Sequence, residues 1–132
     1  MAKYVYPAIF HHEEEGGFSI FFPDIPGCFS QGDDIADGIF MANDALALSL
    51  YSMEKDGETI PPATPLNKVE VEDGDFVTYI SADTLEYQKK FNNKAVKKTL
   101  SIPEWMNEAA VAANLNFSQL LQDAIRERLS LA

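Results

Sequence analysis

The end of the chain places one strand-like and two helix-like segments in too few residues to fold alone. Residues 96–102 alternate between two faces as a β-strand does, and Pro103 ends that strand. Residues 103–113 and 116–129 repeat apolar side chains at helical spacing, and Asn116 has the N-cap position of the second helix. Together these segments occupy about 37 residues, below the roughly 40 at which a domain usually needs help to fold.

This part of the chain must therefore cover its apolar faces with another surface. A single strand exposes unpaired backbone groups, and pairing with its copy in a second chain would satisfy them. Two copies would form a two-stranded ribbon over four helices, so the sequence predicts a homodimer. Trp105 and Phe117 are expected to anchor the core of this helical layer.

The predicted ribbon presents side chains suited to DNA. Lys97, Thr99 and Ser101 alternate onto one face, where ammonium and hydroxyl groups can hydrogen-bond to base edges or phosphates in the major groove. Backbone N–H groups at the start of the second helix favour a phosphate because of helix polarity. The predicted DNA-binding residues are Lys97, Thr99, Ser101, Asn116, Phe117 and Ser118. Alternatively, Lys97 and Lys98 only protect an edge strand from aggregation.

The charge of the chain is unevenly distributed. Residues 1–90 carry 17 acidic and 5 basic side chains, whereas residues 91–132 carry 4 acidic and 5 basic ones, and the net charge is −11. A strongly acidic module repels phosphate and attracts basic partners. The near-neutral tail can still approach DNA, so the two parts differ in the partners that their charge favours.

The first part of the chain predicts three antiparallel strands. Residues 3–12, 18–22 and 28–31 have strand character and are separated by turn-forming sequences. Pro7 cannot donate a hydrogen bond to a neighbouring strand, so the first strand is expected at an edge of the sheet.

One amphipathic helix and a further strand complete this layer. Apolar residues recur at intervals of three or four between residues 35 and 53, and Asp33 or Asp34 can cap the start. A strand over residues 76–80 follows, and residues 69–71 either pair with it or lead into it. One helix on a small, mainly antiparallel sheet predicts the α+β class.

These patterns divide the chain into two domains. The predicted first domain spans residues 1–88, a polar linker spans residues 89–95, and the second domain spans residues 96–132. Residues 83–88 have capping-box spacing and predict one short helical turn before the linker.

Two groups of side chains contain metal-binding types, and neither is expected to bind a metal. His11–Glu15 lies on a predicted hairpin, where adjacent residues point to opposite faces. Five aspartates could form the converging carboxylates of a metal-dependent nuclease, but several fit ordinary helix capping. They are Asp24, Asp33, Asp34, Asp37 and Asp44. No catalytic, metal or cofactor site is therefore predicted, and the protein is not expected to be an enzyme.

The cysteine content indicates the compartment. Cys28 is the single cysteine, so it cannot form an internal disulfide, and it is expected to pack in the core. No segment has the apolar length of a membrane span or the pattern of a signal peptide. A reducing cytoplasm is the expected location, without membrane association.

Four stretches resemble known families. KKTLSIPEW at Lys97–Trp105 and NLNFSQLLQDAI at Asn114–Ile125 resemble ribbon-helix-helix DNA-binding domains of the MetJ/Arc class. YPAIF at Tyr6–Phe10 and FPDIPGCFSQGD at Phe22–Asp33, with the helix and its proline-rich exit, are similar to the HicB antitoxin family. Together these stretches cover almost the whole chain.

The resemblance implies a function for each domain. It implies a degenerate ribonuclease-H-like first domain that binds and blocks a HicA-like toxin, a small ribonuclease that cleaves mRNA using a histidine. It implies a dimeric C-terminal domain that binds operator DNA and represses its own operon. The acidic first module is consistent with a basic partner, but the toxin-binding residues stay unknown. A metal-dependent nuclease of ribonuclease-H-like fold and a ligand-sensing ribbon-helix-helix repressor remain the alternatives.

Overall fold

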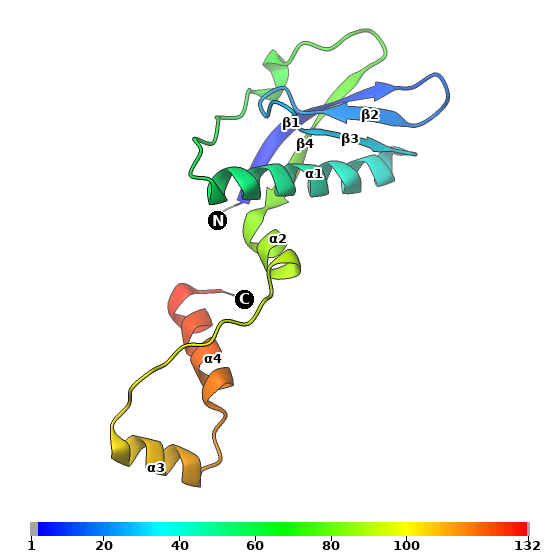
Figure 1. Cartoon of the computed structure of the whole chain (residues 1–132). Helices are drawn as coiled ribbons and strands as arrows, with labels where there is room; N and C mark the ends of the chain where they lie inside the picture. Colours follow the sequence, from blue (N-terminus) through cyan, green and yellow to red (C-terminus); the bar gives the residue numbers. More distant parts are fainter. Residues whose placement is uncertain (1–2, 132) are drawn as a thin grey trace. The chain divides into compact units, whose positions relative to one another are not determined.

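The computed structural model describes residues 3–131 and divides into two compact units, Met1–Lys94 and Ala95–Ala132. Figure 1 shows a four-stranded sheet with a long helix in the first unit, and two helices in the second. The described chain is therefore a mixed α+β protein, which confirms the predicted class at that level.

The sheet of the first unit is antiparallel throughout and has the order β3-β2-β1-β4. Its strands are β1 (Lys3–His12), β2 (Phe18–Phe21), β3 (Phe29–Gly32) and β4 (Phe76–Asp83). The strand predicted over residues 76–80 is thus three residues longer than expected. One face of the sheet packs against the helix α1 (Ile35–Lys55), and the hydrophobic core lies between them (Figure 1).

The prediction that β1 is an edge strand is wrong, because β1 lies between β2 and β4. Pro7 is tolerated there for a local reason. Its partner on β4 is Tyr79, and β2 reaches along β1 only as far as Ile9. The side of Pro7 that would carry an N–H therefore faces away from β4 and lies beyond the last β2 pair, so no sheet hydrogen bond is lost.

The start of α1 confirms the predicted cap. Asp34 is the N-cap, and its Oδ1 accepts a hydrogen bond from the backbone N–H of Asp37 at 2.8 Å. Gly38 lies on the buried face, where an added Cβ would be 3.0 Å from the ring of Phe10 and 3.1 Å from the side chain of Ile20. A glycine thus allows the first turns of α1 to approach the sheet closely.

The segment after α1 forms no strand before β4. A short 3₁₀ helix, η1 (Leu66–Lys68), is followed by Val69–Val71 without regular structure, so these residues lead into β4 rather than pair with it. Asp83 then caps α2 (Thr84–Phe91) by accepting hydrogen bonds from the first-turn N–H groups. The helix is longer than the predicted single turn, and it occupies the first three residues of the segment that we expected to be linker.

The second unit contains the two predicted helices, α3 (Glu104–Ala112) and α4 (Phe117–Leu129). The side chain of Asn116 accepts a hydrogen bond from the N–H of Gln119 at 3.0 Å, which confirms the predicted cap. Residues 96–102 form neither helix nor strand within the single chain. A strand is defined by hydrogen bonds to a second backbone, and no described residue of this chain supplies one.

The helices of the second unit bury little within one chain. Within one chain Trp105 is 67% exposed and Phe117 is 44% exposed, so their role as core anchors of the two-chain helical layer stays a prediction. Among the described residues of this unit, Ala110 is the single buried one. The hydrophobic core of the described chain lies in the first unit.

Candidate interaction surfaces

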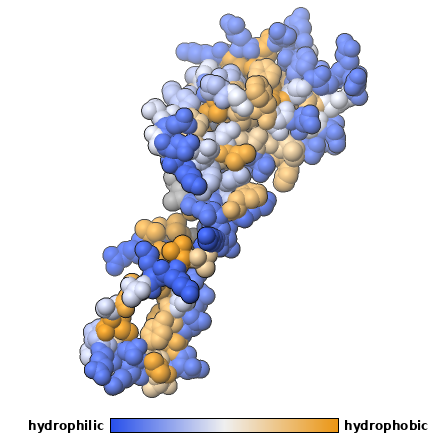
Figure 2. Space-filling view, in the orientation of Figure 1, coloured by the Kyte–Doolittle hydropathy of each residue, from blue (hydrophilic) through white to orange (hydrophobic). Residues whose placement is uncertain are grey.

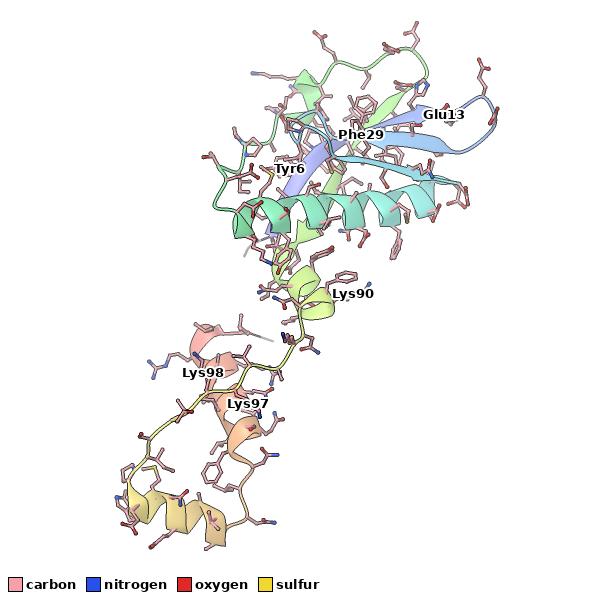
Figure 3. The ribbon with its side chains drawn as sticks, viewed as in Figure 1. Tyr6, Glu13, Phe29, Lys90, Lys97 and Lys98 are labelled. Atoms are coloured by element: carbon pink, nitrogen blue, oxygen red, sulfur yellow. The ribbon has the colours of Figure 1, made fainter. Side chains whose placement is uncertain are left out.

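The predicted DNA-binding residues fall into two local groups. Lys97, Thr99 and Ser101 lie on the exposed segment that leads to α3, and Lys97 is labelled there in Figure 3. Asn116 ends the turn after α3, and Phe117 and Ser118 open α4. The first group presents ammonium and hydroxyl donors. The second presents first-turn N–H groups of α4, which have no acceptor within the helix, although Asn116 already accepts the one of Gln119.

The second unit also exposes an unusual amount of apolar surface. Figure 2 shows orange, apolar side chains over the surface of this unit. Large apolar side chains at helical spacing on α4 remain exposed, although their periodicity is typical of a buried face. The exposed large apolar residues of the unit are Val96, Leu100, Ile102, Trp105, Met106, Val111, Leu115, Phe117, Leu120, Leu121, Ile125 and Leu129. Large exposed apolar surface is typical of interaction sites.

The aspartates of the first unit serve as local hydrogen-bond acceptors. Both carboxylate oxygens of Asp24 accept from Thr64, one from its N–H at 3.0 Å and one from its hydroxyl at 2.6 Å. Asp37 accepts from the backbone N–H of Asp33 at 2.9 Å. Within residues 3–131, no three side chains of histidine, cysteine, aspartate or glutamate converge in a geometry for a metal ion. The converging carboxylates that the nuclease alternative needs are not assembled by the described residues.

One charged contact joins residues far apart in sequence. Nδ1 of His11, at the end of β1, lies 2.6 Å from Oδ1 of Asp75, which precedes β4. This hydrogen bond raises the pKa of His11, and the charge of Asp75 adds to the effect. Nothing in the spacing of these residues predicted the pair, because antiparallel pairing of β1 with β4 brings them together.

Cys28 behaves as predicted. Its side chain is buried in the hydrophobic core between the sheet and α1. Burial raises the pKa of its thiol, so the neutral form is favoured over the nucleophilic thiolate.

A cleft of about 460 Å³ lies between α1, α2, the start of β1 and the end of β4, and we call it the α1–α2 cleft. Ala47, Tyr87 and Phe91 supply apolar lining, and the rings of Tyr87 and Phe91 lie 4.6 Å apart. Charged residues from both helices and both strands surround it. They are Lys3, Asp44, Asp83, Glu86 and Lys90, of which Lys90 is labelled on α2 in Figure 3. This cleft is not predictable from the sequence pattern, because it depends on the extension of α2 to Phe91.

Tyr4 lines the same cleft and ties it to the end of α1. Its hydroxyl donates a hydrogen bond to Oε2 of Glu54 at 2.7 Å. This bond, together with burial, raises the pKa of Tyr4 to about 12. The neutral phenol of Tyr4 is therefore favoured over the phenolate.

No helix within residues 3–131 has the length and apolar character required to cross a membrane. Residues 6–125 match the family described as HicB_like antitoxin of bacterial toxin-antitoxin system. This match spans both structural units.

Two relatives illustrate the similarity at the level of sequence. An uncharacterized 14.9 kDa protein of the rep-hol intergenic region of Haemophilus phage HP1 is 30% identical over 90 residues, which are 66% of this chain and 65% of that protein. Antitoxin HicB of Escherichia coli K12 is 37% identical over 62 residues, which are 47% of this chain and 45% of that protein. The match thus spans less than two thirds of the length of either relative.

Two solved structures show the similarity in three dimensions. A toxin-antitoxin complex from Streptococcus pneumoniae contains a chain with a TM-score of 0.63 and 25% identity, and the match covers 96% of this chain and 99% of that one. A HicA3 and HicB3 toxin-antitoxin complex contains a chain with a TM-score of 0.50 and 28% identity, and the match covers 61% of this chain and 99% of that one. Both similar structures are therefore described as complexes of a toxin with an antitoxin.

Proposed function

The chain belongs to the HicB-like antitoxin family of bacterial toxin-antitoxin systems, and from this premise we propose that it neutralises a HicA-like ribonuclease toxin. The observation that carries the proposal is the family match over residues 6–125, which includes both units. A similar solved chain comes from a complex named for HicA3 and HicB3, which supports a HicA-like partner. In this proposal the protein acts by binding and is not an enzyme.

The first unit is the proposed toxin-binding domain. Residues 1–90 carry 17 acidic and 5 basic side chains, and opposite charge on a ribonuclease that handles RNA would speed their association. This domain, predicted from sequence over residues 1–88 and extended by α2 to Phe91, would have a ribonuclease-H-like fold. The chain would meet its toxin in the cytoplasm, where both are made.

The second unit is the proposed dimerisation and DNA-binding domain, a ribbon-helix-helix over residues 96–132. Its exposed apolar side chains support a partner of the same kind, since one chain buries only Ala110 among the described residues of this unit. Pairing of residues 96–102 with their copy would supply the missing strand partner. The resulting ribbon would enter the major groove of operator DNA and repress the operon.

The six predicted residues divide into two roles on DNA. Thr99 and Ser101 would face base edges from the ribbon, and Lys97 would contact a phosphate. Asn116, Phe117 and Ser118 would present backbone donors of the α4 start to the phosphate backbone.

Co-expression tests the antitoxin half of the proposal. The small protein encoded beside this chain's gene should arrest growth when expressed alone, and this chain should restore growth and co-purify with it. Growth arrest that persists despite both proteins being made would contradict the proposal.

A gel-shift assay on the operon's own upstream DNA tests the repressor half. The full chain should bind as a dimer, and a chain that ends after Lys94, where the first unit ends, should bind the toxin but not the DNA. DNA binding by the truncated chain would place the DNA contacts outside the second unit.

A further inference from the structure

The first unit has a strand edge that no other strand among the described residues pairs with. β4 ends the sheet order and pairs only with β1. Pro7 lies opposite Tyr79, and because proline has no N–H, these two residues cannot exchange hydrogen bonds. The N–H and C=O of Tyr79 therefore point away from β1, and those of Val77 and Ser81 do the same at a period of two. The side chain of Asn43 donates to the carbonyl of Ser81 from that outer side, which agrees with this assignment.

The free edge of β4 runs into the α1–α2 cleft. Ser81, Ala82 and Asp83 form the β4 side of the cleft, and Asn43 forms part of its α1 side. An extended segment that paired with Tyr79 would therefore reach the apolar lining of the cleft with its next side chains, because strand residues advance about 3.3 Å each. Phe91 is 57% exposed at the far side of that lining.

The charge around the free edge of β4 favours a basic partner. Residues 69–88 contain six carboxylates and no lysine or arginine. The lining of the cleft includes Asp44, which is exposed on α1, and in total it holds three carboxylates (Asp44, Asp83 and Glu86) and two lysines (Lys3 and Lys90). A second copy of this edge would bring like charges face to face, which destabilises strand pairing. A basic segment would instead be attracted to the same edge.

We propose that a basic, extended segment of the partner toxin adds to the free edge of β4 and seats one apolar side chain in the α1–α2 cleft. Main-chain hydrogen bonds to Val77 and Tyr79 would hold the segment. The size and apolar lining of the cleft would determine which side chain of the segment binds there. This inference rests on the proposed function, since it locates the surface by which the first unit holds its toxin.

A proline at Tyr79 tests the edge itself. Tyr79→Pro removes an N–H that points outward and leaves the bonds from β4 to β1 in place. Tyr79→Ala removes the same side chain and keeps the N–H, so it is the matched control. Affinity for the toxin should fall by about tenfold more in Tyr79→Pro than in Tyr79→Ala. Equal affinities in the two variants, with both shown to be folded by circular dichroism, would overturn the inference.

A charge reversal tests the cleft without altering the backbone. Asp44→Lys should weaken toxin binding, and the loss should shrink at high salt. Glu14→Lys makes the same change of net charge at the exposed turn between β1 and β2, and it should bind almost as wild type does. An equal loss in both variants would mean that only the total charge matters, which overturns the choice of this surface.

Residue-resolved amide exchange separates this inference from the proposed function. In the free protein, Val77 and Tyr79 should exchange quickly while Thr78 and Ile80 are protected by β1. In the complex with the toxin, Val77 and Tyr79 should become protected. If the toxin binds and their exchange is unchanged, the inference fails and the proposed function stands. If the toxin does not bind the wild-type chain at all, both fail. Protection in the free chain that disappears on dilution would show self-pairing and overturn the inference.

Discussion

Nδ1 of His11 and Oδ1 of Asp75 lie 2.6 Å apart, although 64 positions separate them along the chain. The contact fastens the end of β1 to the turn that precedes β4, and the side chain of Asp75 is only 7% exposed. The hydrogen bond favours the charged imidazolium, so the pKa of His11 lies above its usual value.

This pair predicts a pH-dependent contribution to stability. The folded pKa of His11 is raised above an unfolded value of about 6.5, so the native state holds the proton more tightly. The stabilisation is fully present below about pH 6.5 and is lost as the pH rises through the folded pKa. His11→Asn should therefore lower the melting temperature near pH 5.5, at about one unit below the unfolded pKa, and have little effect in alkaline buffer. An equal loss at both pH values would contradict this account.

We expect Gly38→Ala to destabilise the fold, although Gly38 lies in a helix. Gly38→Ala would improve the helix propensity of α1, but its Cβ would press on the ring of Phe10 at 3.0 Å. Overpacking of a well-packed core costs about 1 to 3 kcal/mol, which exceeds the gain of about 1 kcal/mol in propensity. Urea unfolding should show a net loss of stability. A more stable variant would mean that α1 can move away from the sheet at little cost.

We expect the proposed dimer of the second unit to depend on Leu121. It is the least exposed of the large apolar side chains on α4, and the proposed dimer would bury it. Leu121→Glu should shift the protein toward the monomer in sedimentation-velocity experiments, because a buried charge without a partner is costly. Gln122→Glu adds the same charge at the neighbouring position and should leave the dimer intact. A Leu121→Glu protein that remains dimeric would place the interface elsewhere.

We expect Lys97 to contribute to the salt dependence of the proposed operator binding. Lys97→Ala should weaken binding and lower the salt slope by up to about two, one phosphate for each chain of the proposed dimer. Lys98 is adjacent but lies on the opposite face of the proposed ribbon, so Lys98→Ala is the matched control and should change the slope less. Equal effects of the two substitutions would indicate that the lysines act without a defined ribbon face.

Local patterns predicted the helices of this chain well. Asp34 and Asn116 cap α1 and α4 as their spacing indicates, because in each cap a side-chain oxygen accepts from a backbone N–H only three residues later. The position of β1 within the sheet was not predictable in the same way. Pro7 is compatible with an inner strand only because β2 ends before reaching it. No residue next to Pro7 in the sequence indicates where the neighbouring strand ends.

The candidate surfaces also differ in whether local sequence patterns or the tertiary structure determine them. Periodicity located the apolar faces of α3 and α4, although their exposure in one chain could not be seen from spacing alone. The α1–α2 cleft and the free edge of β4 require tertiary information. They depend on which strand ends the sheet and on the extension of α2 to Phe91.

Because α3 and α4 bury little apolar surface within one chain, we expect the folding of the second unit to depend on protein concentration. If two tails must meet to acquire a core, their ordering follows mass action, and the melting temperature of the tail rises with protein concentration. The first unit, whose core is complete in one chain, has no such dependence. Dilution would thus disorder the proposed operator-binding unit first, while the proposed toxin-binding unit keeps its fold.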